Sequence, residues 1–187
     1  SKSKQATSRQ KLLQKLTLED IKPSSRRYPY IAFKSEREAG NQLLTVENLS
    51  KSVDGQTIFR NVSFSLDKKD KVAIISRDDR AASLLFDILF NETKPDTGEF
   101  KWGTTITPSY FPKENTEFFN TDLNLVDWLR QYSTEKDESF IRGFLGRMLF
   151  SGEESQKKSN VLSGGEKVRC MLSKMMMEAG NVLVLDD

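Results

Sequence analysis

The segment VLSGGEKVR, Val161–Arg169, combines residue types that could bind an anion where a helix begins. Ser163 and Glu166 have the spacing of a capping box, in which each side chain satisfies a backbone N–H of the other residue. A capping box alone indicates only a well-started helix. It does not explain Gly164 and Gly165, because each glycine in a helix costs about 1 kcal/mol relative to alanine. The glycines are explained if a ligand approaches this backbone, and the N–H groups of a helix start favour phosphate.

Hydrophobic periodicity predicts the elements that position this segment. We expect a helix at 164–178 and then a buried strand, Val182–Leu185, which ends at Asp186 and Asp187. Upstream, the pattern predicts strands at 43–49, 62–66 and 72–75, a turn at Gly55, a helix at 81–90, short strands at 100–102 and 105–110, and helices within 122–150. This order predicts an α/β fold with a helical insertion.

Composition excludes several function classes. The 187 residues include no histidine and one cysteine, Cys170. Serine–histidine hydrolases, histidine metal sites and internal disulfides are therefore excluded. No apolar run approaches the ~20 residues that span a bilayer, and the N-terminus is not a secretory signal. These features predict a soluble, cytoplasmic protein with no membrane partner.

The net charge of +2 hides a basic arm. Residues 1–34 hold nine of the 29 Lys and Arg residues and two of the 27 acidic residues, which gives +7 there and −5 in the remainder. The periodicity predicts an amphipathic helix over about residues 3–22, which Pro23 ends. Such an arm could contact RNA phosphates or could be a solvated helix, and charge alone leaves both interpretations open.

LSGGEKVR resembles the signature motif of ATP-binding cassette proteins, and the resemblance extends over nearly the whole chain. TIFRNVSFSL, residues 57–66, resembles the opening strands of a cassette, and NVLVLDD, 181–187, resembles its Walker B strand. SKSKQATSRQKLLQKL, residues 1–16, resembles the end of the helical linker of ABC-F proteins, a tandem-cassette subfamily linked to the ribosome and translation. The chain is most similar to the second cassette of that subfamily.

The resemblance implies a P-loop NTPase-like cassette core with an antiparallel β subdomain and a small helical subdomain. It implies a linker arm and connector at 1–41, a nucleotide-binding core at 42–113, a helical subdomain at 114–162, and the signature helix with the Walker B strand at 163–187. The cofactors implied are ATP and Mg²⁺. Two cassettes pair head-to-tail, so the partner implied is the N-terminal cassette of the same protein, and each ATP lies between the P-loop of one cassette and the signature of the other.

The P-loop departs from the family pattern GxxxxGK[ST]. The matching stretch, SRDDRAAS at 76–83, has Ser76 and Ala81 in place of the two glycines and Ala82 in place of the lysine. Glycines allow positive φ and close approach of amides to phosphate. The lysine supplies a charge-assisted contact, worth on the order of ten- to hundredfold in affinity. Asp79 adds repulsion, while Ser83 remains at the magnesium-ligand position.

Other positions of the implied nucleotide site are also altered. The adenine-stacking aromatic of the family falls on Val53, and the Q-loop glutamine falls on Lys113. Asp186 matches the Walker B aspartate, a magnesium ligand in the family. Asp187 stands at the position of the catalytic glutamate and is one methylene shorter, which would position an attacking water less well.

These departures predict an asymmetric cassette. Its own P-loop is degenerate, whereas Ser163, Gly164, Gly165 and Glu166 are intact and would serve ATP on the partner cassette. The family continues beyond Asp187 with a further core strand, so we expect an exposed strand edge and self-association of this stretch of chain.

Two other functions stay open at this stage. The chain could be the nucleotide-binding subunit of an ABC membrane transporter, which would not need the basic arm. It could also be a non-catalytic pseudo-cassette that acts as a scaffold, although that alternative leaves Gly164 and Gly165 unexplained. As part of an intact tandem protein we expect ATPase activity, and the chain alone is expected to be inactive.

Overall fold

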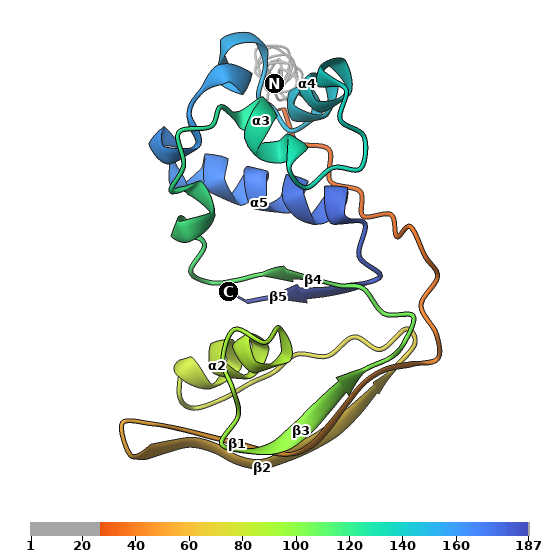
Figure 1. Cartoon of the computed structure of the whole chain (residues 1–187), viewed down its shortest axis with the longest axis vertical. Helices are drawn as coiled ribbons and strands as arrows, with labels where there is room; N and C mark the ends of the chain where they lie inside the picture. Colours follow the sequence, from red (N-terminus) through yellow and green to blue (C-terminus); the bar gives the residue numbers. More distant parts are fainter. Residues whose placement is uncertain (1–26, 187) are drawn as a thin grey trace, which may run out of the picture.

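The computed structural model describes residues 27–186 and stacks three layers along its long axis (Figure 1). A three-stranded sheet with one helix lies at one end, a two-stranded sheet lies in the middle, and a group of helices forms the other end. The predicted helix at 3–22 and Asp187 lie outside the described residues.

The three-stranded sheet is antiparallel, with the order β2-β1-β3. Its strands are β1 (Gln42–Val53), β2 (Gln56–Asp67) and β3 (Thr97–Trp102). The predicted turn at Gly55 joins β1 to β2, with positive φ at both Asp54 and Gly55, as a tight hairpin requires. This sheet confirms the strands predicted at 43–49 and 62–66 and extends both.

One face of β1 forms the core of this layer. Leu44 and Val46 alternate toward the core, and a bulge at Asn48 (φ 51°) lets Leu49 face the same side. Gly98 of β3 crosses this bulge so closely that a Cβ would lie 2.4 Å from the backbone of Asn48. The buried side of the sheet therefore depends on a glycine at this crossing.

Helix α2 (Arg80–Leu89) covers the sheet and confirms the helix predicted at 81–90. Leu85, Ile88 and Leu89 are buried against β1 because they recur at helical spacing. The indole Nε1 of Trp102 donates to the Leu89 carbonyl at 2.9 Å, which fixes the end of α2 to β3.

The central layer consists of two parallel strands, β4 (Pro108–Phe111) and β5 (Val182–Leu185). Their register runs from Pro108 opposite Val182 to Phe111 opposite Leu185. Gly180 precedes β5 where a Cβ would lie 2.9 Å from the Thr107 carbonyl oxygen. The carboxyl ends of both strands meet at one edge, where α/β proteins place ligands.

The helical layer consists of short elements around one long helix. They are η1 (Thr116–Phe119), α3 (Leu125–Arg130), α4 (Glu138–Arg147), η2 (Gly152–Gln156), η3 (Ser159–Val161) and α5 (Gly164–Glu178). Trp128 and Phe119 stack at 4.9 Å between ring centroids and are buried with Cys170 and Met171 of α5. The helix predicted at 164–178 is confirmed, whereas the region 122–150 is two helices interrupted at 131–137.

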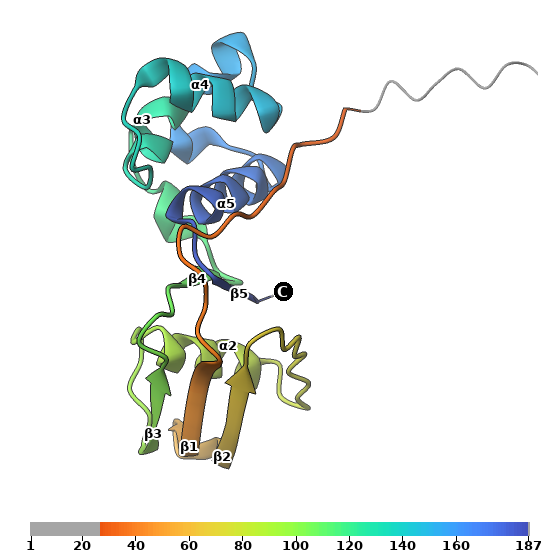
Figure 2. The same ribbon diagram turned by 90° about the vertical axis from the view of Figure 1, so that its right-hand side faces the viewer.

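The strand predicted at Val72–Ile75 is wrong. These residues form an extended loop, and Ile75 is 92% exposed. The physical reason is that no strand within residues 27–186 pairs with this segment, and an unpaired segment has no ladder of hydrogen bonds. Figure 2 shows the connection between β2 and α2 as a loop, apart from β5.

β5 forms as predicted, but it is not buried on both faces. Leu185 is 60% exposed and Leu183 is also exposed, since β4 is the strand that pairs with β5. Together with the Val72–Ile75 loop, these side chains leave apolar surface uncovered. No helix within residues 27–186 has the length and apolar character needed to cross a membrane.

Candidate functional site

The helix tip at Ser163 forms the predicted capping box. The Ser163 N–H donates to Oε2 of Glu166 at 2.8 Å, and the Ser163 hydroxyl donates to the same oxygen at 2.7 Å. The second carboxylate oxygen, Oε1, accepts from Nζ of Lys157 at 2.8 Å. The Glu166 carboxylate is thus shared between the helix start and a lysine nine residues upstream.

Gly164 and Gly165 lie exposed in the first turn of α5. At both positions the space that a Cβ would enter is open, with no other side chain of the described chain within 4 Å. Internal packing therefore does not account for two glycines whose helical cost is about 1 kcal/mol each. Gly164 and Gly165 are thus exposed at the start of a 15-residue helix, where the first N–H groups have no partner within the helix.

The charge of Glu166 is held by its neighbours. The hydrogen bond from Lys157, followed by those from the Ser163 hydroxyl and N–H, lowers the pKa of Glu166 to about 2. Glu166 in turn raises the pKa of Lys157. Both groups stay ionised at neutral pH, and the carboxylate also complements the positive end of the α5 dipole.

Polar groups of the loop at 76–83 bond to one another. Oδ1 of Asp78 accepts from the backbone N–H of Arg80 at 2.9 Å and from its Nε at 3.0 Å, and Oδ2 accepts from NH2 at 2.8 Å. The Ser76 hydroxyl donates to the Asp78 carbonyl at 2.6 Å. Arg80, a possible replacement for the missing lysine, is therefore bound by Asp78, and this contact lowers the pKa of Asp78 to about 2.

The remaining loop positions belong to the start of α2. Asp79 precedes the helix, is exposed, and makes no capping hydrogen bond with its side chain. Ala81 is buried, and Ala82 and Ser83 are half-buried in the first helical turn. The methyl group of Ala81 thus stands where the family pattern has a glycine whose amide approaches phosphate. That of Ala82 stands where the pattern has a lysine.

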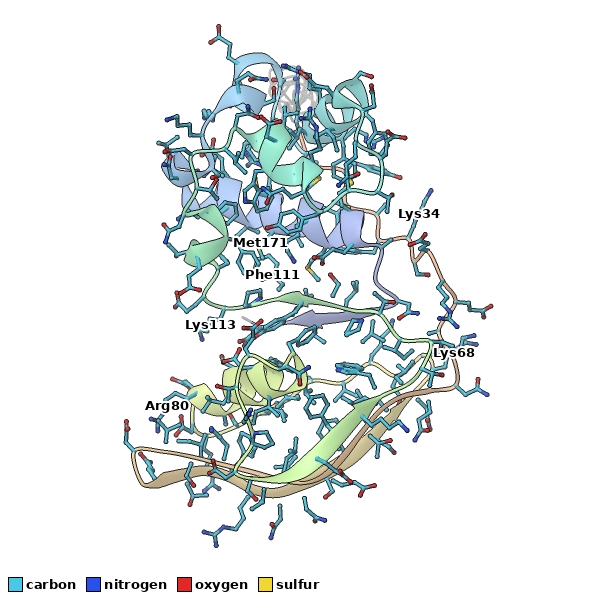
Figure 3. All side chains as sticks on the ribbon, in the orientation of Figure 1. Lys34, Lys68, Arg80, Phe111, Lys113 and Met171 are labelled. Carbon is cyan, nitrogen blue, oxygen red and sulfur yellow. The ribbon has the colours of Figure 1, made fainter. Side chains whose placement is uncertain are left out.

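Val53 and Lys113 come from two different layers, the three-stranded sheet and the central sheet. Val53 pairs with Gln56 at the β1–β2 hairpin, and Oε1 of Gln56 accepts from NH2 of Arg80 at 3.3 Å. Lys113 follows β4 and is exposed. In Figure 3, Lys113 and Arg80 lie toward the edge where the carboxyl ends of β4 and β5 meet.

Asp186 is buried directly after β5 and lies beside a phenol. The Tyr110 hydroxyl is 3.4 Å from Oδ2 of Asp186 and 3.4 Å from Oδ1 of Asp87. Burial, with the charges of both carboxylates, raises the pKa of Tyr110. Burial also raises the pKa of Asp87, and the charge of Asp186 adds to that effect.

Two donors of the 76–83 loop are already paired within the loop. A phosphate cradle needs free amides and a cation, and here Asp78 occupies the Arg80 guanidinium and one loop N–H. Within residues 27–186 no group of three or more Cys, Asp or Glu residues is arranged to hold a metal ion. At the tip of α5 the Ser163 hydroxyl is bonded to Glu166, whereas Gly164 and Gly165 are exposed to a ligand that approaches from outside.

The sequence by itself does not single out three residues of these clusters. Asp87 and Tyr110 come from α2 and β4, and Tyr110 contacts Asp87 across 23 positions of chain and Asp186 across 76. Lys157 stands nine residues before Glu166, in a stretch with two adjacent lysines. Only the folded chain distinguishes Lys157, which contacts Glu166, from Lys158, which contacts Asp122.

The chain is similar in sequence to a known family and to several known proteins. Residues 59–187 match the family model described as ABC transporter. The chain is 61% identical over 189 residues to the uncharacterized ABC transporter ATP-binding protein YkpA of Bacillus subtilis (strain 168), covering 100% of this chain and 35% of that protein. It is 30% identical over 188 residues to ABC transporter F family member 2 of Arabidopsis thaliana, covering 99% of this chain and 28% of that protein.

The fold is also similar to a solved structure. A bacterial Atm1-family ABC exporter with ATP bound aligns with a TM-score of 0.61 at 16% identity, over 96% of this chain and 35% of the exporter chain. At that identity the likeness concerns the fold alone, and it agrees with the predicted α/β class with an antiparallel β subdomain. The chain spans about a third of the length of the curated relatives it matches.

Proposed function

The chain belongs to the ABC transporter family as an ATP-binding cassette domain, and from this membership we propose that it supplies its signature helix to ATP held by a partner cassette. The observation that carries the proposal is the contrast between its two anion-binding elements. The tip of α5 is open at Gly164 and Gly165, whereas the 76–83 loop is occupied by the Asp78–Arg80 pair.

The chemistry available at the α5 tip is hydrogen-bond donation to phosphate oxygens. ATP supplies the phosphoanhydride bond whose hydrolysis drives members of this family. Within this chain, Ser163 presents its hydroxyl, and the exposed first turn presents the Gly164 and Gly165 amides. These groups and the positive end of the α5 dipole would stabilise negative charge on an adjacent phosphate.

The capping box sets a condition on this role. The Ser163 hydroxyl already donates to Glu166, so it must exchange that contact for a phosphate oxygen when the partner closes. A hydroxyl carries one proton and can rotate, so this exchange costs one local hydrogen bond. The amides of Gly164 and Gly165 would need no such exchange, because the first N–H groups of a helix have no partner within it and both residues are exposed.

Two measurements test the two halves of this proposal. Titration of ATP–Mg²⁺ into the chain should give no micromolar binding. Micromolar binding that is lost when the 76–83 loop is mutated would refute the proposal that this loop is degenerate. In the tandem protein, Ser163→Arg should reduce ATP hydrolysis strongly, because a long cation fills the open tip. Unchanged turnover in Ser163→Arg would refute the signature half.

We further propose that the protein is an ABC-F tandem cassette and that this chain is its second cassette with the end of the linker. The proposed divisions are the linker and connector at 1–41, the core at 42–113, the helical subdomain at 114–162 and the signature region at 163–187. The ABC-F name of the Arabidopsis relative supports the subfamily. The +7 charge of residues 1–34 supports the linker. The alternative, a transporter subunit, predicts membrane-spanning segments in the same or a neighbouring reading frame and no second cassette.

RNA of the ribosome is the partner that we propose for the arm, which also implies a cytoplasmic location. Tyr28 and Tyr30 are 75% and 56% exposed, although the segment is fixed to the helical layer. The Tyr30 N–H donates to the Arg147 carbonyl at 2.9 Å, and the Arg147 guanidinium lies 5.9 Å from the Tyr30 ring centroid. Exposed aromatic rings beside cations can stack on unpaired bases. Figure 2 shows this segment passing α5 toward the helical end.

Ribosome co-sedimentation with a slowly hydrolysed ATP analogue tests this partner. We expect the tandem protein to sediment with ribosomes more strongly with the analogue than without nucleotide. Tyr28→Ser with Tyr30→Ser should weaken the association, and Tyr28→Phe with Tyr30→Phe should preserve it, since phenylalanine keeps the ring. Absence of co-sedimentation in all conditions would remove the ribosome from the proposal and leave the cassette function standing.

A further inference from the structure

We infer that Lys157 is a positioning residue for the signature serine, acting through Glu166 and linking the helical layer to the tip of α5. The inference rests on the proposed function of that tip and adds to it a residue outside the signature motif. It concerns how Ser163 is held at the start of α5 before a phosphate reaches the tip.

The geometry divides the Glu166 carboxylate between two neighbours. Oε1 accepts from Lys157 at 2.8 Å, and Oε2 accepts both the N–H and the hydroxyl of Ser163, at 2.8 and 2.7 Å. With one oxygen fixed by a cation, the second oxygen is directed to Ser163. Without Lys157 the carboxylate can rotate toward water, and Ser163 loses the fixed acceptor that holds its N–H and hydroxyl.

The backbone of Lys157 is itself fixed to the helical layer. Its N–H donates to the Glu154 carbonyl at 3.2 Å, and its carbonyl accepts from the N–H of Leu125 at 3.0 Å. Leu125 is the first residue of α3 and is fully buried. Two residues later, the buried Ser159 donates its N–H to the Leu123 carbonyl at 2.9 Å. A movement of α3 therefore moves the backbone that carries the Lys157 side chain.

Charge gives a second reason for a cation at this position. The Glu166 carboxylate lies in the first turn of α5, which we propose to face a triphosphate. The carboxylate and the triphosphate are both negative and would repel one another. The side chain of Glu166 is 13% exposed and that of Lys157 is 41% exposed, so the pair is partly shielded from solvent. Lys157 thus offsets the charge of the carboxylate at Oε1, while Oε2 stays on Ser163.

The neighbouring lysine provides a matched control. Lys158 carries the same charge one residue later, but its Nζ lies 3.4 Å from Asp122 and both side chains are largely exposed. Lys157→Met and Lys158→Met therefore remove the same group from the same segment, and only the first removes the contact with Glu166. Lys157→Arg keeps the charge, and Glu166→Gln removes the partner charge.

The experiment measures hydrolysis by the tandem protein and the titration of Glu166 in this chain. We expect Lys157→Met to lower kcat about three- to fivefold, the upper part of the range of a partly exposed ion pair, with Lys158→Met unchanged and Lys157→Arg within about twofold. In a Glu166→Gln background, Lys157→Met should add less than about a twofold loss, because the two residues act through one contact. By carboxyl NMR, the pKa of Glu166 should rise in Lys157→Met.

The outcomes separate this inference from the function on which it rests. Three results would overturn the role of Lys157 even if Ser163→Arg still abolished hydrolysis. They are an unchanged Glu166 titration in Lys157→Met, a wild-type kcat in Lys157→Met, or the same fold-loss of kcat when Lys157→Met is added to Glu166→Gln. If Ser163→Arg left hydrolysis intact, the signature function would fail and the positioning role with it. The NMR titration would then still report whether the ion pair exists, so the two failures are distinguishable.

Discussion

The guanidinium of Arg80 lies against the carboxylate of Asp78, with Nε 3.0 Å from Oδ1 and NH2 2.8 Å from Oδ2. The two residues sit in the loop where the family pattern would grip phosphate. The carboxylate satisfies the cation that could have replaced the missing lysine. The loop thus holds an internal ion pair in addition to lacking the glycines of the family pattern.

Restoring the family residues should restore nucleotide affinity. We expect Ala81→Gly with Ala82→Lys to strengthen ATP–Mg²⁺ binding by about ten- to hundredfold, because the lysine adds a charge-assisted contact and the glycine opens the backbone. Isothermal titration measures the change. Ala81→Gly with Ala82→Met, which adds length without charge, is the control and should give no gain. A lysine variant that binds no better than this control would contradict the explanation.

Neutralising Asp87 should stabilise the fold near neutral pH. Burial raises the pKa of Asp87, so folding favours its protonated form. This contribution is complete below the unfolded pKa near 4 and is lost as the pH rises through the folded pKa. Asp87→Asn should therefore raise Tm at pH 7, by on the order of 1–2 °C because the group is partly screened, and the difference should shrink toward pH 4. Thermal unfolding at both pH values tests this, with the exposed Asp79→Asn as control.

The two tryptophans should differ in their contribution to stability. Trp128 is 1% exposed and its Nε1 donates to the Phe118 carbonyl at 2.6 Å, whereas Trp102 is half-buried and donates to the Leu89 carbonyl. Trp128→Phe should cost about 2–3 kcal/mol, from a cavity and an unpaired buried carbonyl, and Trp102→Phe about 1 kcal/mol. Urea denaturation compares them. Equal costs would mean that the helical core relaxes around the smaller ring.

The uncovered apolar surface should make the chain self-associate. Ile75 and Leu185 are 92% and 60% exposed, on the loop and on β5. Burying such side chains between molecules is favourable, and β5 lacks a described partner on one edge. Sedimentation velocity should show concentration-dependent association, reduced in Ile75→Lys with Leu185→Lys. Phe140→Lys, on α4 at the helical end, should leave association unchanged. A wild-type chain that stays monomeric at every concentration would contradict this prediction.

Much of the local structure follows from the sequence because short-range rules decide it. The Ser163–Glu166 spacing predicts the start of α5, and the capping box forms there. The Asp54–Gly55 pair predicts a tight turn, and both residues adopt positive φ. The absence of glycine and lysine in SRDDRAAS is likewise readable residue by residue. In each case the deciding contacts lie within a few positions of chain.

Tertiary structure decided the features that depend on distant partners. Val72–Ile75 has the composition of a buried strand, yet it is a loop, since a strand exists only when a neighbour accepts its hydrogen bonds. Tyr110 meets Asp87 and Asp186, and Lys157 rather than Lys158 meets Glu166, because the packing of α2, β4, β5 and α3 brings them together. Sequence thus determined which chemical groups the chain carries and where its local elements begin. The fold determined which of those groups are paired and which remain open to a ligand, because hydrogen bonds and ion pairs form only between atoms that lie close together in space.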